Sequence, residues 1–426
     1  MQSYMLMLIQ IIALVLAFIS QKHEALASSS LVVPVNKHAT TNSLYSTHAY
    51  FNYPQYHQQN LLIDLDAPFM WHSSFPHQES CEACPNPVRC EEFQCTDLRT
   101  TFSYESPLCP PPTNNSMYDE YNYCEVCPVN IISPVTGECS QVITTFEQFM
   151  FTRSYGGRNV IPHNLYVTYP IVGSTPPWTF DLFPSSVVGV IALSSSPYAL
   201  PAYLRNPVNR IIALCLPSTV SIPGVLFLGN GPYYLNPESN VDIRSLLSYT
   251  ELLKHPKSFG YFIGVNAVVI KNRSLNVPAN ATTKISTLDP YTKLRTDIYN
   301  GVVQRFSMVT KRIPPAKLVA PFGLCFNTSV NGTIVGIKVP DIDLVLQDGK
   351  KWTISTANSI KQVTEDVACL AVVDGGPTSE HAIVVGTYQF EDNFLLLNLE
   401  NSTFGFSSSL LHRHTSCSNF NFTVSQ

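Results

Sequence analysis

The chain has 426 residues, of which 45% are hydrophobic and 13% are charged, and its formal net charge at pH 7 is -5. A chain of this length and apolar content can bury a sizeable core and is expected to form more than one domain, which excludes an intrinsically disordered protein. The low, slightly acidic charge also excludes a basic surface for nucleic acid or for an anionic membrane.

Residues 1–27 are predicted to be a cleaved signal peptide. Residues 5–19 form an apolar block, and Ala25-Leu26-Ala27 has the small-x-small pattern that a signal peptidase requires. The only positive charge before this block is the terminal amine, so an uncleaved anchor stays open as an alternative. No later stretch is long and apolar enough to span a bilayer, so we expect no membrane contact after cleavage.

The stretch from Leu61 to Ser74 begins with an apolar run that ends on Asp64 and continues into a turn and a tryptophan. This pattern is typical of a strand that carries a carboxylate into a functional site. The alternative is that Asp64 and Asp66 are turn residues after an edge strand, because short apolar runs are ambiguous.

The cysteines indicate an oxidising compartment, since an even number in an exported chain predicts disulfides. The 12 cysteines are Cys81, Cys84, Cys90, Cys95, Cys109, Cys124, Cys127, Cys139, Cys215, Cys325, Cys369 and Cys417. Those from residue 81 to residue 139 lie in a proline-rich block that we predict to be a disulfide-stapled loop insertion. Its two C-x-x-C pairs could bind zinc, but the cysteines crowded between them favour disulfides, so we predict no metal and no cofactor.

Sequons for N-glycosylation support export and predict a secreted glycoprotein. They lie at Asn114, Asn272, Asn280, Asn327, Asn331, Asn401 and Asn421.

Most of the remaining sequence predicts β-strands, because β-branched and aliphatic runs alternate with Asn-Gly and Asp-Gly turns. The predicted strands are 210–216, 224–229, 261–270, 333–346, 369–374, 381–386 and 394–399. The clearest predicted helix is 297–313, with Thr296 as its cap, and 196–204 is a shorter candidate. Residues 284–294 repeat the strand-and-turn pattern of the Leu61 stretch, which suggests two similar lobes that meet at a cleft.

With these motifs in order, the chain resembles the plant pepsin-like family that contains the xylanase inhibitors, the basic 7S globulins and the extracellular dermal glycoproteins. The matching segments are 61–71, 134–139, 187–192, 196–201, 227–232, 286–291 and 386–392, together with the cysteine layout. The resemblance implies a mainly β, bilobal aspartic proteinase fold with two barrel-like lobes around a cleft. We assign residues 28–240, with the insertion at 81–139, to the first lobe and residues 241–426 to the second.

An aspartic proteinase needs one acid from each lobe, because the two carboxylates share a proton. The first acid of the family motif corresponds to Asp64, whereas Ser286 stands where the second acid belongs. A serine hydroxyl cannot act as that acid at ordinary pH, and Asp289 lies three residues away in front of a proline. Residues 136–138, where the family's flap hairpin falls, contain no flap tyrosine. We therefore predict that catalysis is lost.

The resemblance implies an inhibitor or binding protein for secreted glycoside hydrolases such as xylanases or glucanases, in plant defence. In the family a histidine shortly before the last cysteine enters the target's active site. The corresponding residue here is Arg413, between His412 and His414, and a cation there could pair with the carboxylates of a glycosidase. The alternative for this segment is an ordinary solvated loop.

Two other functions stay open for the whole chain: an endopeptidase with residual activity, and a 7S-globulin-like storage or hormone-binding protein. The resemblance further implies disulfides between Cys325 and Cys369 and between Cys215 and Cys417. It also implies an extracellular or cell-wall location, with the vacuole as the alternative.

Overall fold

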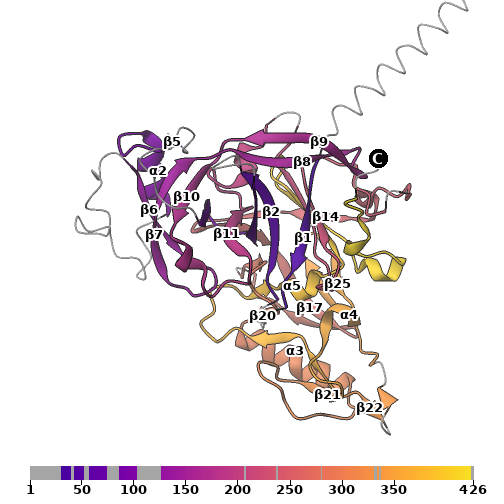
Figure 1. Cartoon of the computed structure of the whole chain (residues 1–426). Coiled ribbons are helices and arrows are strands. Elements are labelled where there is room, and N and C mark those ends of the chain that lie inside the picture. The colour runs from indigo at the N-terminus through magenta and orange to yellow at the C-terminus, as the bar shows by residue number, and fades with distance from the viewer. Residues whose placement is uncertain are drawn as a thin grey trace, which may run out of the picture.

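The computed structural model describes residues 30–39, 43–51, 57–73, 86–102, 126–205, 208–236, 238–279, 281–330, 333–334 and 337–423. The predicted signal peptide lies outside these residues. Strands dominate the described chain; α2 and α3 lie toward the outside of the molecule, whereas α5 lies near its centre (Figure 1). None of the described helices is long and apolar enough to cross a membrane.

The largest sheet has 16 strands and combines segments from both halves of the chain. From the first half come β1 (Leu31–Lys37), β2 (Tyr45–Phe51), β3 (His57–Asp64), β4 (Met70–Ser73), β5 (Asn86–Pro87), β6 (Pro128–Ile132), β7 (Cys139–Phe146), β8 (Phe149–Tyr155), β9 (Asn159–Thr168), β10 (Ile171–Thr175), β11 (Val187–Ala192), β12 (Ile211–Cys215) and β13 (Gly224–Leu228). From the second half come β14 (Ser248–Glu251), β30 (Phe394–Asn398) and β31 (Thr403–Phe406).

Four smaller sheets complete the second half of the described chain. The six-stranded sheet contains β15 (Leu253–His255), β16 (Ser258–Ile263), β19 (Thr283–Ile285), β20 (Thr292–Leu294), β28 (Val372–Asp374) and β29 (Ile383–Val385). The others contain β17 (Val265–Ile270), β18 (Arg273–Asn276), β24 (Ile342–Leu346) and β25 (Lys351–Ile354); β21 (Cys325–Asn327), β26 (Ile360–Gln362) and β27 (Val367–Leu370); and β22 (Ser329–Val330) with β23 (Thr333–Ile334).

The helices are α2 (Phe93–Phe102), α3 (Thr296–Val309), α4 (Thr356–Ser359) and α5 (Thr387–Phe390). The 3-10 turns are η1 (Pro177–Phe180), η2 (Leu200–Tyr203), η3 (Ile243–Leu246), η4 (Leu410–Arg413) and η5 (Cys417–Asn419).

The two halves of the chain repeat one arrangement of strands. In the first half β3, β11, β4 and β10 are neighbours in that order, and in the second half β19, β29, β20 and β28 follow the same order. Both sets alternate parallel, antiparallel and parallel pairing. The predicted bilobal, mainly β fold is therefore confirmed, although the sheets are open rather than closed into barrels.

Helix α3 confirms the clearest helix prediction and corrects its ends. Ile298, Val302 and Phe306 form its buried face, as the period of 3.6 residues requires. Thr296 lies inside the helix and donates its hydroxyl to Asp374 instead of capping the amino end. The helix stops at Val309, and the following Thr310 donates its hydroxyl and its N–H to the carbonyl of Phe306.

Five further predictions differ from the structure. Within the predicted strand 333–346 the described residues 337–341 are not strand and separate β23 from β24, and the predicted strand 369–374 is divided between β27 and β28 at Ala371. The predicted strand 261–270 is divided at Gly264, where a Cβ would lie only 2.1 Å from the side chain of Gln347. The predicted helix 196–204 is only the 3-10 turn η2. The insertion, predicted to be a loop, contains helix α2. This helix buries Cys95 and Leu98 and is held by the Cys95–Cys127 disulfide. Sequence periodicity does not reveal the helix, because the disulfide and tertiary packing stabilise it.

The disulfides Cys215–Cys417 and Cys325–Cys369 form as the resemblance implies. Cys139 is also disulfide-bonded, whereas Cys81, Cys84, Cys109 and Cys124 lie outside the described residues. Because Cys127 is in a disulfide, it cannot serve as a thiolate ligand for zinc. Within the described ranges no cluster of His, Cys, Asp and Glu could hold a metal ion.

The described sequons differ in exposure. Asn272, Asn401 and Asn421 are exposed, and Asn327 is half-buried on β21. Asn114, Asn280 and Asn331 lie outside the described residues.

Candidate functional site

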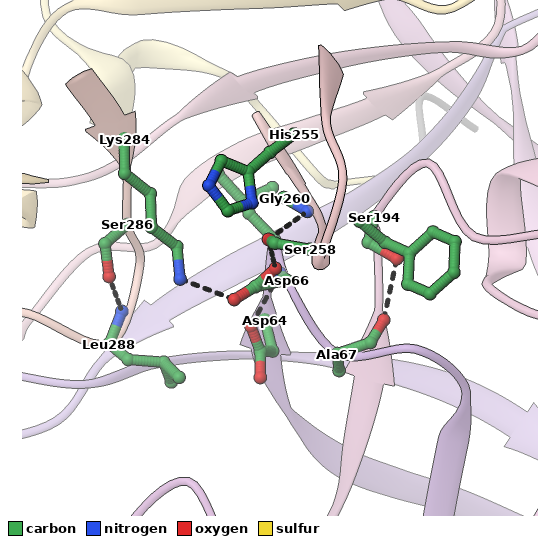
Figure 2. A network of polar contacts seen from close by, with 12 residues as sticks. Asp64, Asp66, Ala67, Ser194, His255, Ser258, Gly260, Lys284, Ser286 and Leu288 are labelled. Atoms are coloured by element: carbon green, nitrogen blue, oxygen red, sulfur yellow. Dashed lines mark hydrogen bonds and ion pairs between the residues drawn. The ribbon is translucent and has the colours of Figure 1, made fainter. Parts of the chain in front are cut away.

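Asp64 is the last residue of β3, and its position opposite Ala192 in the parallel β3–β11 pair places it at the carboxyl edge of the sheet. Its side chain is only 6% exposed, and its Oδ1 accepts a hydrogen bond of 2.8 Å from the backbone N–H of Asp66 (Figure 2). Burial raises the pKa of Asp64 to about 6, and the negative charge of Asp66 adds to this effect. Asp64 is therefore protonated in mildly acidic solution.

Ser286 occupies the corresponding place in the second half, directly after β19, and it is as buried as Asp64. Its Oγ accepts hydrogen bonds of 3.2 Å from the backbone N–H groups of Leu288 and Asp289. The hydroxyl thus stabilises its own turn, in the way that serine side chains commonly do. Asp64 faces no second carboxylate at this position.

Asp289 does not replace the missing acid. Its carboxylate pairs with Lys293 Nζ at 2.5 Å, and its backbone carbonyl accepts the N–H of Thr387. The side chain is therefore held by the strand that follows its own motif, in agreement with the sequence-based expectation.

Thr287 connects the two motifs, a role that the sequence analysis missed. Its Oγ1 donates to the carbonyl of Ile63 at 2.8 Å and accepts the N–H of Leu65 at 3.3 Å. The first motif makes no equivalent hydrogen bond to the second, because the matching residue is Leu65, which has no hydroxyl and packs into the core. The sequence signal for this contact was the hydroxyl residue, Thr287, directly after Ser286.

Asp66 was also missed as a connecting residue. Its Oδ2 pairs with Lys284 Nζ from β19, and its Oδ1 accepts a hydrogen bond from Ser258 of β16, each at 2.5 Å (Figure 2). Burial alone would raise the pKa of Asp66, but the charge of Lys284 and these hydrogen bonds outweigh it and lower that pKa. Asp64 and Asp66, two residues apart, thus have pKa values shifted in opposite directions.

The segment at 136–138, where the flap hairpin was expected, is a plain turn, and so is the turn that follows Tyr155 at the end of β8. Thr136 and Gly137 lie at the tip of the β6–β7 hairpin, where Gly137 has a φ of +72° and can adopt it without a Cβ clash. Tyr155 begins the turn between β8 and β9, and its side chain is exposed.

His412, Arg413 and His414 are exposed on and just after η4. Leu410 anchors this turn in a buried cluster, and its N–H donates to the carbonyl of Asp392. On the other side the Cys215–Cys417 disulfide fixes the chain. His414 has a φ of 55°, so the backbone turns sharply after Arg413.

The repeated strand order, with Asp64 at the end of β3 and Ser286 directly after β19, defines a pepsin-like fold. The chain belongs to the plant family of xylanase inhibitors, basic 7S globulins and extracellular dermal glycoproteins. Residues 45–230 match the xylanase inhibitor N-terminal family model, and residues 260–408 match the xylanase inhibitor C-terminal model.

Similar proteins cover nearly the whole chain. A probable aspartic proteinase GIP2 of Nicotiana benthamiana is 33% identical, with 95% of this chain and 94% of the relative covered. Chitinase CLP of Oryza sativa subsp. japonica is 31% identical, with 92% of each chain covered. Gamma conglutin 1 of Prunus dulcis is 34% identical, with 95% of this chain and 93% of the relative covered.

Solved structures agree with this family. The crystal structure of edgp aligns with a TM-score of 0.78 at 31% identity and covers 93% of this chain and 99% of that one. The crystal structure of conglutin gamma from lupine seeds aligns with a TM-score of 0.73 at 25% identity, covering 93% and 99%.

Proposed function

We propose that this chain is a secreted, catalytically inactive pepsin-like protein that binds and inhibits glycoside hydrolases directed at the plant cell wall. The observation that carries the proposal is the exposed turn with His412, Arg413 and His414, on a fold whose family models are those of xylanase inhibitors.

Loss of proteolysis follows from the second motif. Peptide hydrolysis by this fold needs one ionised and one protonated carboxylate that share a water molecule. The Ser286 hydroxyl does not ionise at ordinary pH and therefore cannot act as the second acid, and its oxygen already accepts two backbone hydrogen bonds. Asp64 alone, largely protonated below pH 6, leaves no base beside it for the water.

The turn that carries Arg413 is suited to an anionic active site. Glycoside hydrolases use two carboxylates that flank the scissile bond. A guanidinium between them forms charge-assisted, bidentate hydrogen bonds. Because Leu410 and the Cys215–Cys417 disulfide hold the turn in place, little conformational freedom is lost on binding.

Incubation of the full mature chain with a panel of purified microbial xylanases and β-glucanases tests the proposal. We expect at least one enzyme to be inhibited, and Arg413→Ala to weaken that inhibition by more than roughly tenfold, as expected for a buried charge pair. Arg273→Ala, which removes an exposed arginine from β18, is the matched control and should inhibit like the wild type.

Two results would overturn the proposal. Equal inhibition by the Arg413 and Arg273 variants would mean that the turn is not part of the binding surface. If no enzyme of the panel is inhibited, the storage function would be the better explanation. Pepstatin-sensitive cleavage of a denatured protein at about pH 3–5, where carboxylates titrate, would contradict the loss of catalysis.

A further inference from the structure

The ion pair between Asp66 and Lys284 joins the two lobes directly beside Asp64 (Figure 2). Asp66 lies in the turn after β3, and Lys284 lies in β19, one residue before Ile285. The two side chains are 32% and 20% exposed, respectively, so water screens their attraction less than it screens a surface pair.

The surroundings of Asp66 are shaped to hold a carboxylate. Ser258 donates to one carboxylate oxygen and accepts the N–H of Gly260 at 3.0 Å, while Lys284 contacts the other oxygen. A Cβ on Gly260 would lie 2.7 Å from Asp66 Oδ1, closer than real Cβ atoms approach. The absence of a side chain at position 260 therefore makes room for the carboxylate.

Other contacts join the same two surfaces. Ser195 donates its N–H and its hydroxyl to the carbonyl of Phe259, and the Tyr261 hydroxyl donates to the carbonyl of Leu193 at 2.6 Å. The segment after β11 thus packs along β16, next to the pair formed by Asp66 and Lys284.

We propose that Asp66, Ser258 and Lys284 form a clamp between the lobes that holds the two motifs together. Through its one carboxylate, Asp66 closes the turn after the first motif against β16 and β19 of the second lobe.

Two ionisable groups, Asp64 and His381, interact electrostatically with both Asp66 and Lys284. His381 also interacts with His255 and Glu380, and His255 Nε2 lies 3.7 Å from Glu380 Oε1. Burial and the charge of Lys284 lower the pKa of His381, so this histidine resists becoming a second cation beside Lys284.

The sign of the pH dependence follows from Asp66. Its pKa is lower in the folded chain than in the unfolded chain. The stability it contributes is therefore fully present above the ordinary carboxylate pKa and is lost only as the pH falls through the lowered folded pKa. The clamp is expected to persist in the mildly acidic range and to open in strong acid.

Hydrogen exchange of the full mature chain at about pH 5, above the ordinary aspartate pKa, tests the clamp. The variants are Asp66→Asn and Lys284→Met, and the control is Lys293→Met, which breaks the Lys293–Asp289 pair within the second lobe. We expect amides in 61–67, 193–195, 258–262 and 284–288 to exchange roughly fivefold faster in either clamp variant, the size of effect that a partly exposed pair supports. The double variant should exchange no faster than the single ones.

Unchanged exchange in both clamp variants, or an equal increase in the Lys293 control, would overturn the proposal. If Lys284→Met does not fold, Lys284→Arg keeps the charge and should retain wild-type exchange, whereas Ser258→Ala should give an intermediate increase. As the pH falls through the lowered pKa of Asp66, the wild type, corrected for intrinsic rates, should approach Asp66→Asn.

The clamp proposal can be rejected without rejecting the proposed inhibition. Arg413 lies on a separate turn of the chain, so Asp66→Asn should still inhibit a susceptible glycoside hydrolase like the wild type. Unchanged exchange with unchanged inhibition would reject the clamp alone.

Discussion

The two lobes have the same strand order around their motifs, but the buried polar side chains next to these strands carry charge in the first lobe and are neutral in the second. The first lobe buries charge: Asp64 ends β3, and His72 on β4 pairs with Glu147 at 2.7 Å. Next to its motif the second lobe buries neutral groups: Ser286 follows β19, and Thr292 on β20 donates twice to Gln389. Its buried carboxylates, Glu391 and Asp392, lie outside these strands, and Glu391 pairs with Lys37 of the first lobe. One topology therefore accommodates either kind of interior, provided that every buried group has a partner.

The difference is clearest in how each polar group is satisfied. His72 donates Nδ1–H to the carbonyl of Ser73 and Nε2–H to Glu147, so its ring is an imidazolium. Burial opposes this charge, but Glu147 outweighs burial and raises the pKa of His72. Gln389 accepts from Thr292 and donates its amide to the carbonyls of Asn358 and Ala371, which requires no charge at all. This part of the second lobe, around Thr292 and Gln389, therefore lacks this dependence on pH.

The largest expected effect comes from breaking the charged pair of the first lobe. Glu147→Gln leaves His72 without its counter-charge in the core, and we expect a loss of about 3 kcal/mol in the free energy of unfolding. Urea unfolding near neutral pH measures it, with Glu138→Gln at the exposed hairpin turn as the control. A loss no larger than that of the control would show that the pair does not stabilise the lobe.

Neutralising Asp64 should remove one part of the contrast between the motifs, because an uncharged residue then ends β3, as uncharged Ser286 follows β19. An acid with a raised pKa favours folding while it is protonated, and this contribution disappears as the pH rises through about 6. Asp64→Asn should therefore gain stability relative to the wild type by on the order of 2–3 kcal/mol between about pH 3 and pH 7. Unfolding curves across this range that stay parallel for the two proteins would refute the expectation.

Thr287 of the second motif makes hydrogen bonds to the first motif that have no equivalent in the other direction. Thr287→Val keeps the shape of the side chain but leaves the Ile63 carbonyl and the Leu65 N–H without this partner. We expect a loss of about 1–2 kcal/mol, measured by thermal or urea unfolding. Thr364→Val, which removes an exposed hydroxyl bonded to Asp366, is the control and should change stability by less than about 0.5 kcal/mol. An equal loss in the two variants would mean that the bond does not hold the lobes together.

The sequence predicted the β class, the two lobes and the substitution of Ser286 for an acid, because strand patterns and motif residues are local. It also predicted α3, although not its ends, since Thr296 is drawn to Asp374, a partner distant in sequence. Helix α2 escaped prediction for the same reason, because the Cys95–Cys127 disulfide and buried packing stabilise it.

The residues 61–67 and 284–290 by themselves determined that one half of the chain has an acid where the other has a hydroxyl. Only the tertiary structure decided what these residues contact. Asp66, expected to be at most a turn residue, pairs with Lys284, and Thr287 bonds across to Ile63. These partners lie more than two hundred positions away in sequence, with separations of 218 and 224, and the packing of one sheet against another brings them together. No local pattern encodes such a distance, because it depends on how both lobes fold and meet.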